Sequence, residues 1–139
     1  LDFDLDLAKS DSKENIFYYI QYAHARIFSI EDKYKKTFDK QITNKTDIKN
    51  SSFIKCDELI HEISKFPNLV LKSSNSLQPH LIVFYLRDLS QLFHSFYNDN
   101  HVLSESEENI ELIMFCLNGV KQTIANGLGL LGITPMKKM

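Results

Sequence analysis

Apolar residues recur at steps of three and four along three long stretches of the chain, and this spacing constrains the fold more than any other feature. The first stretch starts near Glu14 and carries Ile16, Ile20, Ala23, Ile27 and Ile30. The second opens at Pro79 and carries Ile82, Tyr85, Leu86, Leu89, Phe93 and Phe96. The third carries Ile110, Ile113, Leu117, Val120 and Ile124. Such spacing puts the apolar side chains on one face of an α-helix, so it predicts three long helices.

The limits of these helices, and one or two shorter helices, follow from breakers and caps. The polar stretch Lys40–Ser52 predicts an exposed loop after the first long helix. Pro67 predicts a break between a short helix at Asp57–Phe66 and a second helical turn at Asn68–Lys72. We expect the second long helix to end within Asn98–His101.

The last long helix has a start signal and a stop signal. Ser104 and Glu107 have the spacing of a capping box, which predicts a helix start. The pair Asn126-Gly127 has the residue types of a helix C-cap, so we expect the helix to end there. Leu128–Ile133 should then pack as an apolar tail.

The first residues follow a different pattern. Apolar and acidic residues alternate through Leu1–Leu7, as in a half-buried strand or an extended arm. We therefore predict an extended or poorly ordered connecting arm at 1–13 and a helical domain at 14–139. The chain begins without Met, so we expect a piece of a longer protein. The predicted fold class is all-α: a helical bundle of three long helices plus one or two short ones, with an extended N-terminal arm.

Composition limits the class of protein further. With 139 residues, 43% of them hydrophobic, the chain can bury a single core. Two cysteines without metal-ligand spacing, and no apolar run of about 20 residues, favour a reduced cytoplasmic protein that does not bind a membrane. The net charge of −2 argues weakly against a nucleic-acid partner. However, acids concentrate in 1–14 and 104–111, which leaves the remaining chain net positive.

Four blocks of residues carry a resemblance to a known family. They are Phe3-Asp4-Leu5-Asp6, Gln21-Tyr22-Ala23-His24-Ala25-Arg26 preceded by Asn15 and Tyr19, His94-Ser95-Phe96-Tyr97-Asn98, and Ala125 to Ile133. In this order they resemble the C-terminal anticodon-binding (DALR-type) domain of bacterial arginyl-tRNA synthetases. The ending Lys138-Met139 also resembles the natural C-terminus of that family. Two positions depart from it: Ile16 stands where the family often has Pro, and Asn100-His101 where it has a Cys-Arg pair.

The resemblance implies a role in charging tRNA with arginine. The partners would be the anticodon stem–loop of arginine tRNA and the protein's own catalytic domain upstream, in a monomeric enzyme that is an arginine–tRNA ligase. That catalytic domain would use ATP with magnesium, but neither of its ATP-binding signatures occurs in this chain. We therefore expect the chain alone to be catalytically inert, with no catalytic residue, cofactor or metal of its own.

The candidate RNA contacts begin on one face of the first long helix. This face carries Tyr18, Tyr22, Ala25, Arg26 and Ser29. Unpaired bases stack on tyrosine rings or on a guanidinium group, so Tyr22, Arg26 and Tyr18 are candidates for tRNA binding. The alternative is that the tyrosines cover the helix against a neighbour and Arg26 pairs with a carboxylate. His24 lies on another face, where a hydrogen-bonded structural role is expected.

Two further sites complete the list of candidate contacts. Tyr97 and Asn98 would present a ring and an amide at a helix end. Lys138 and Met139 would form a basic end that lies along the anticodon loop. A different class of function stays open: a helical domain that docks other proteins and has no RNA role.

Overall fold

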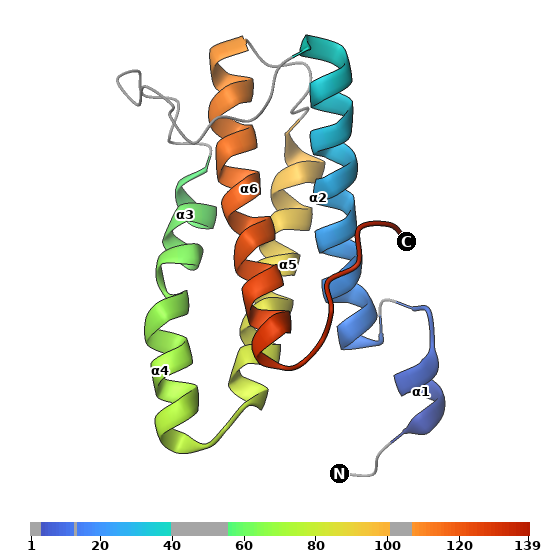
Figure 1. Cartoon of the computed structure of the whole chain (residues 1–139), viewed down its shortest axis with the longest axis vertical. Coiled ribbons are helices and arrows are strands. Elements are labelled where there is room, and N and C mark those ends of the chain that lie inside the picture. The colour runs from blue at the N-terminus through green and yellow to red at the C-terminus, as the bar shows by residue number, and fades with distance from the viewer. Residues whose placement is uncertain (1–3, 13, 40–55, 101–106) are drawn as a thin grey trace.

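The computed structural model describes residues 4–12, 14–39, 56–100 and 107–139, and within these residues the chain is all-α, as predicted (Figure 1). Six helices and no strand occur in this described part. They are α1 (Leu5–Lys9), α2 (Ile16–Phe38), α3 (Asp57–Ser64), α4 (Phe66–Ser76), α5 (His80–Asp99) and α6 (Glu107–Leu130). The three long helices predicted from the spacing are α2, α5 and α6. The predicted loop at 40–52 and Ser104 of the capping box lie outside the described residues.

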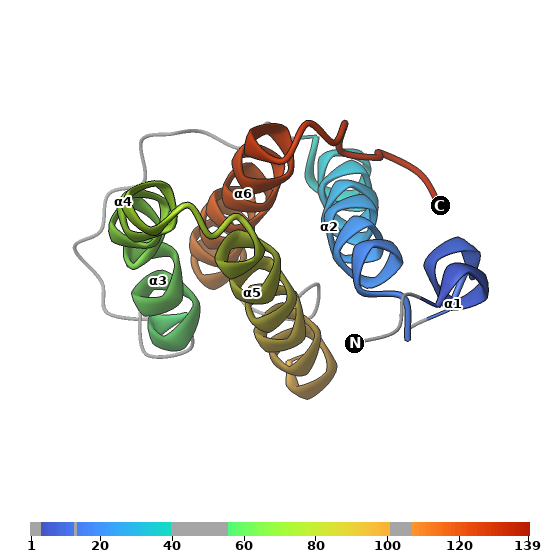
Figure 2. The ribbon, with the colours of Figure 1, turned by 90° about the horizontal axis from the view of Figure 1, so that it is seen from below.

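The core forms where the three long helices pack against one another. The stripes expected to face inward are buried, including Ile20 and Ile27 on α2, Leu89 and Phe93 on α5, and Leu117 on α6. Figure 2 shows α3 and α4 against α5 and α6, on the side away from α2. The short helices therefore cover α5 and α6 rather than α2.

The N-terminal arm differs from its prediction, because residues 5–9 form a short helix, α1, rather than an extended segment. The Asp4 carboxylate caps it by accepting a hydrogen bond from the Leu7 amide at 2.9 Å. No residue of α1 is buried, so this local cap, and not a partner strand, decides its conformation. The division into an arm at 1–13 and a domain at 14–139 stays a prediction.

Asn15 determines how the chain enters α2. Its Oδ1 accepts hydrogen bonds from the amides of Phe17 and Tyr18, while its Nδ2 donates to the carbonyls of Ala8 and Ser10. A single side chain thus caps α2 and ties the end of α1 to it. The absence of the family's proline at Ile16 leaves this helix start intact.

The short helices divide at Pro67 differently from the prediction. α3 ends at Ser64, and Phe66, expected to end it, begins α4 with Pro67 in the first turn. α4 then continues to Ser76, well beyond the single turn predicted. Its apolar residues Phe66 and Leu69 pack against the core, which supplies stability that the local sequence does not reveal.

The end of α6 also differs, because Asn126-Gly127 does not terminate it. The helix continues to Leu130, and the cap is Gly132 with φ of 74°. The Ile133 amide donates to the Leu128 carbonyl and the Gly132 amide to the Gly129 carbonyl, which is a Schellman arrangement. Gly127 instead serves packing: a Cβ there would lie 2.7 Å from Cδ2 of Leu86 on α5.

Gly127 and Gly129 offer a matched test of this packing. Gly127→Val should lower the free energy of unfolding by about 1–3 kcal/mol, because the fully buried Leu86 must move. Gly129→Ala should raise it by up to about 1 kcal/mol, because nothing lies within 4 Å and alanine favours the helix. Urea unfolding of both variants measures the difference. Equal effects would contradict a close contact between α5 and α6 at Gly127.

Candidate nucleic-acid interface

A groove with a volume of about 310 Å³ lies between α2 and α5. Its seven lining residues are Tyr19, Tyr22, Arg26, Gln91, His94, Ser95 and Asn98. They include one arginine, one histidine and no carboxylate. Gln91, Ser95 and Asn98 are exposed, so the groove opens to solvent. The surface it offers is aromatic, cationic and rich in neutral hydrogen-bonding groups.

Arg26 is held in place by two tyrosines, one from each helix. Its Nη1 donates a hydrogen bond of 2.6 Å to the Tyr22 hydroxyl, one turn earlier on α2. Its Cζ lies 4.8 Å from the ring centroid of Tyr97 on α5 and 5.8 Å from that of Tyr22. Three predicted contacts from two distant segments thus form one cluster. Among the described residues, Arg26 contacts these tyrosines and not a carboxylate, and its RNA contact stays a prediction. Asn98, a fourth predicted contact, lines the same groove.

His94 forms the aromatic wall of the groove beside this cluster. Its ring stacks on Tyr22 at a centroid separation of 5.4 Å and an interplanar angle of 25°, and it lies 5.1 Å from Tyr19. Burial raises the pKa of the Tyr19 hydroxyl, so this hydroxyl stays protonated and can donate. Neither His94 nor Tyr19 was predicted as a contact, although both fall within the blocks that carry the family resemblance.

Two members of a polar row on α5, Gln91 and Ser95, were missed as well, although Asn98 in the same row was predicted. Gln91, Ser95 and Asn98 follow at steps of four and three, which is the spacing of one helical face. This polar face could have been recognised beside the apolar stripe of the same helix. Its position opposite Tyr22 could not, because that depends on how α5 packs against α2.

The predicted α2 face does not act as one surface. Tyr22 and Arg26 line the groove, but Tyr18 does not, and Ala25 is buried. The Ser29 hydroxyl donates to the Ala25 carbonyl of its own helix. Tyr18 is half-buried and does not line the groove, so its RNA contact stays a prediction.

The C-terminal tail lies along a different side of α2 from α5 (Figures 1 and 2). Gln21 bonds to the backbone of Thr134 and Met136, and His24 bonds to the Met136 carbonyl. Lys138 and Met139 are exposed beyond these contacts. The expected structural role of His24 is thereby confirmed. The predicted RNA contacts of Lys138 and Met139 lie outside the groove, on the neighbouring side of the helix.

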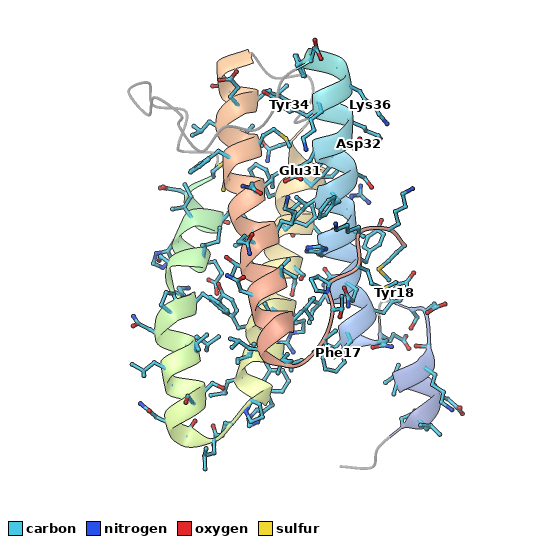
Figure 3. All side chains as sticks on the ribbon, in the orientation of Figure 1. Phe17, Tyr18, Glu31, Asp32, Tyr34 and Lys36 are labelled. Atoms are coloured by element: carbon cyan, nitrogen blue, oxygen red, sulfur yellow. The ribbon has the colours of Figure 1, made fainter. Side chains whose placement is uncertain are left out.

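Two acidic residues in the second half of α2 form ion pairs with lysines. Figure 3 shows Glu31 turned toward α6 and Asp32 turned outward. The Glu31 carboxylate, only 4% exposed, accepts bonds of 2.7 and 2.6 Å from Lys121 of α6. Asp32 pairs with Lys36 on the surface, and this hydrogen bond lowers the pKa of the Asp32 carboxyl. These pairs reduce the negative charge beside the tail.

Within the described residues, no group of three or more His, Cys, Asp or Glu side chains could hold a metal ion. Cys56 and Cys116 are buried, and a hydrogen bond that the Cys116 thiol makes to Cys56, together with burial, raises the pKa of the Cys116 thiol. That thiol is therefore not an activated nucleophile. In the part of the chain that the structure describes, no helix is both long and apolar enough to cross a membrane.

Known proteins have sequences similar to this one over nearly its whole length. An arginine–tRNA ligase from Geobacter metallireducens is 42% identical over 99% of this chain, and one from Acinetobacter baylyi is 36% identical over all of it. The chain spans about a quarter of the length of these curated relatives: 25% of the first and 24% of the second.

Solved structures show the same likeness. A Campylobacter jejuni structure assigned as an arginyl-tRNA synthetase superposes with a TM-score of 0.80 at 26% identity, covering 100% of this chain and 30% of that one. The arginyl-tRNA synthetase of Thermus thermophilus gives 0.74 at 27% identity, covering 95% and 22%. The family model of the DALR anticodon binding domain matches residues 20–139. The chain therefore belongs to the DALR anticodon binding domain family.

Proposed function

We propose that this chain recognises the anticodon stem–loop of arginine tRNA as the C-terminal part of a cytoplasmic arginine–tRNA ligase. The observation that carries the proposal is the cluster in which Arg26 is held by Tyr22 and Tyr97 at the groove between α2 and α5. Family membership and the arginine–tRNA ligases among the relatives support the choice of tRNA. The steps that use ATP with magnesium would belong to the rest of a monomeric enzyme.

The groove has the chemistry to receive an unpaired base. The Tyr22 ring and the Arg26 guanidinium offer flat surfaces on which a base can stack. Gln91, Ser95 and Asn98 carry amide and hydroxyl groups that can donate to and accept from a base edge. An anticodon loop exposes such bases, whereas a paired helix hides them.

We expect the chain to bind arginine tRNA with an affinity that falls steeply as salt rises, because each neutralised phosphate of a single strand contributes a slope of about −0.7 to log K against log salt. Filter binding at several salt concentrations measures this slope. A stem–loop with an unrelated anticodon should bind more weakly at every salt concentration.

Two results would count against the proposal. Equal affinity for the unrelated stem–loop would mean binding by charge alone, without recognition of the anticodon. No tRNA binding at low salt would favour the protein-docking alternative. The exposed apolar side chains where α4 meets α5, namely Leu71, Leu77 and Phe84, are the surface that alternative would use.

A further inference from the structure

The side-chain amide of Gln21 pairs with the backbone of the C-terminal tail. Its Nε2 donates to the Thr134 carbonyl at 2.9 Å, and its Oε1 accepts from the Met136 amide at 2.8 Å. The amide therefore pairs as a neighbouring β-strand would. Gln21 is only 8% exposed, so losing either bond would leave a largely buried polar group unsatisfied.

His24 holds the same tail residue from the next turn of α2. It is 3% exposed, and its Nδ1 lies 2.6 Å from the Met136 carbonyl oxygen. A carbonyl only accepts, so Nδ1 must carry the proton and donate. Because all three bonds reach backbone atoms, Gln21 and His24 determine where the tail runs, whatever its side chains are.

Beyond Met136, the two lysines of the tail stay within reach of α2. Lys137 Nζ lies 5.5 Å from the ring centroid of Phe28. The pKa of Asp32, one turn further along α2, is lowered chiefly by its hydrogen bond to Lys36 and to a small extent by the charge of Lys138. Figure 1 shows the tail rising beside α2 and turning outward near the middle of that helix, where the chain reaches C. Both lysines are exposed, so their charges stand on the side of α2 next to the one that forms the groove.

We infer that Gln21 and His24, here called the tail clamp, are positioning residues for RNA binding: they hold residues 134–139 so that Lys137 and Lys138 meet the RNA backbone. The choice of RNA rests on the proposed function. A tail held in place loses less conformational entropy when it binds phosphate than a free tail would, so the clamp should raise affinity.

The surroundings of His24 make the clamp sensitive to pH. Burial is the largest cause that lowers the pKa of His24, and the positive charges of Lys121 and Lys137 act in the same direction. The bond to Met136 and the charge of Glu31 oppose this but do not outweigh it. The pKa of His24 is therefore lower in the folded chain than its value of about 6.5 in the unfolded chain. Above pH of about 6.5, His24 is neutral and its contribution to holding the tail is fully present. This contribution is lost as the pH falls through the pKa that His24 has in the folded chain.

Amide hydrogen exchange tests the clamp without RNA. Gln21→Ala should reduce the protection factor of the Met136 amide at least tenfold and leave core amides of α5 unchanged, whereas Gln122→Ala, an exposed glutamine on α6, should change neither. Protection in the unsubstituted chain should fall between pH 7 and pH 5.5. His24→Asn keeps a donor near Nδ1 but does not titrate, so it should retain protection across that range. Unchanged protection in Gln21→Ala would overturn the inference.

Binding to arginine tRNA tests the positioning role. Gln21→Ala should weaken affinity about three- to tenfold and make the salt slope shallower by about 1, the scale of one or two lost phosphate contacts. The double substitution Lys137→Ala with Lys138→Ala should give a similar loss, and adding Gln21→Ala should cost nothing more. If the unsubstituted chain binds but Gln21→Ala binds equally well, the inference fails and the proposed function stands. If the unsubstituted chain does not bind, the proposed function fails.

Discussion

Lys121→Met is expected to lower the free energy of unfolding by about 3–5 kcal/mol, because it leaves the Glu31 carboxylate buried without its partner. The Glu31 side chain is 4% exposed and that of Lys121 is 16% exposed, so little water can replace the lost ammonium group. Lys121 Nζ also lies 4.6 Å from the ring centroid of Phe28, and this contact is lost as well. Urea or thermal unfolding at neutral pH measures the change.

The chain contains a matched control for this substitution. Lys36 pairs with Asp32 at 2.6 Å, but those side chains are 74% and 62% exposed. Lys36→Met should therefore change the free energy of unfolding by less than about 1 kcal/mol. Combining Glu31→Gln with Lys121→Met should recover much of the loss, because no unpaired charge remains. Equal effects of Lys121→Met and Lys36→Met would contradict a buried ion pair between α2 and α6.

Tyr22→Ala is expected to weaken binding of arginine tRNA tenfold or more. A base stacked on an aromatic ring contributes about 1–3 kcal/mol, and each 1.4 kcal/mol is about a factor of ten. Removing the ring also removes the hydroxyl that accepts from Arg26 and the surface on which His94 stacks. Tyr22 is only half-buried. Tyr22→Ala should therefore lower the free energy of unfolding by less than the loss of about 3–5 kcal/mol that follows when a buried aromatic side chain is truncated.

Two further variants separate binding from folding. Tyr22→Phe keeps the ring but not the hydroxyl, so a small loss would assign the effect to stacking and a large one to the orientation of Arg26. Phe84→Ala removes an exposed ring of α5 that does not line the groove, and it should leave tRNA affinity unchanged. If Tyr22→Ala shifts the unfolding midpoint strongly while the folded variant binds normally, Tyr22 is a packing residue and not an RNA contact.

The sequence alone was sufficient for the three long helices and the core between them, because both depend on short-range spacing. Positions such as Ile27, Phe93 and Leu117 each occur at a helical step from other apolar residues, and burial is the most favourable arrangement for such a face. The blocks around Gln21–Arg26 and His94–Asn98 were likewise enough to identify the family, and the family match confirms that identification.

Local sequence patterns predicted the wrong structure in two places: where two patterns overlapped, and where packing against another helix outweighed the local preference. The alternation at residues 1–7 favoured an extended arm, but Asp4 caps a helical turn there. Asn126-Gly127 has the composition of a helix end, yet continuing α6 buries Leu128 and brings Gly127 against Leu86. Glycine suits both a cap and a close helix contact, and only the neighbouring helix distinguishes the two.

The sequence by itself determined the three long helices, their buried faces and the family, because each of these depends on residues that are near one another in the chain. Only the tertiary structure decided that Tyr22 and Arg26 line one groove, that Tyr97 packs on Arg26 and that Tyr18 does not line the groove. It also decided that Gln21 and His24 hold a tail 112 to 115 residues away. Both results depend on how far each helix is rotated about its axis and where it crosses its neighbours. That geometry comes from the fit of whole side-chain surfaces, which spacing along a single helix does not contain.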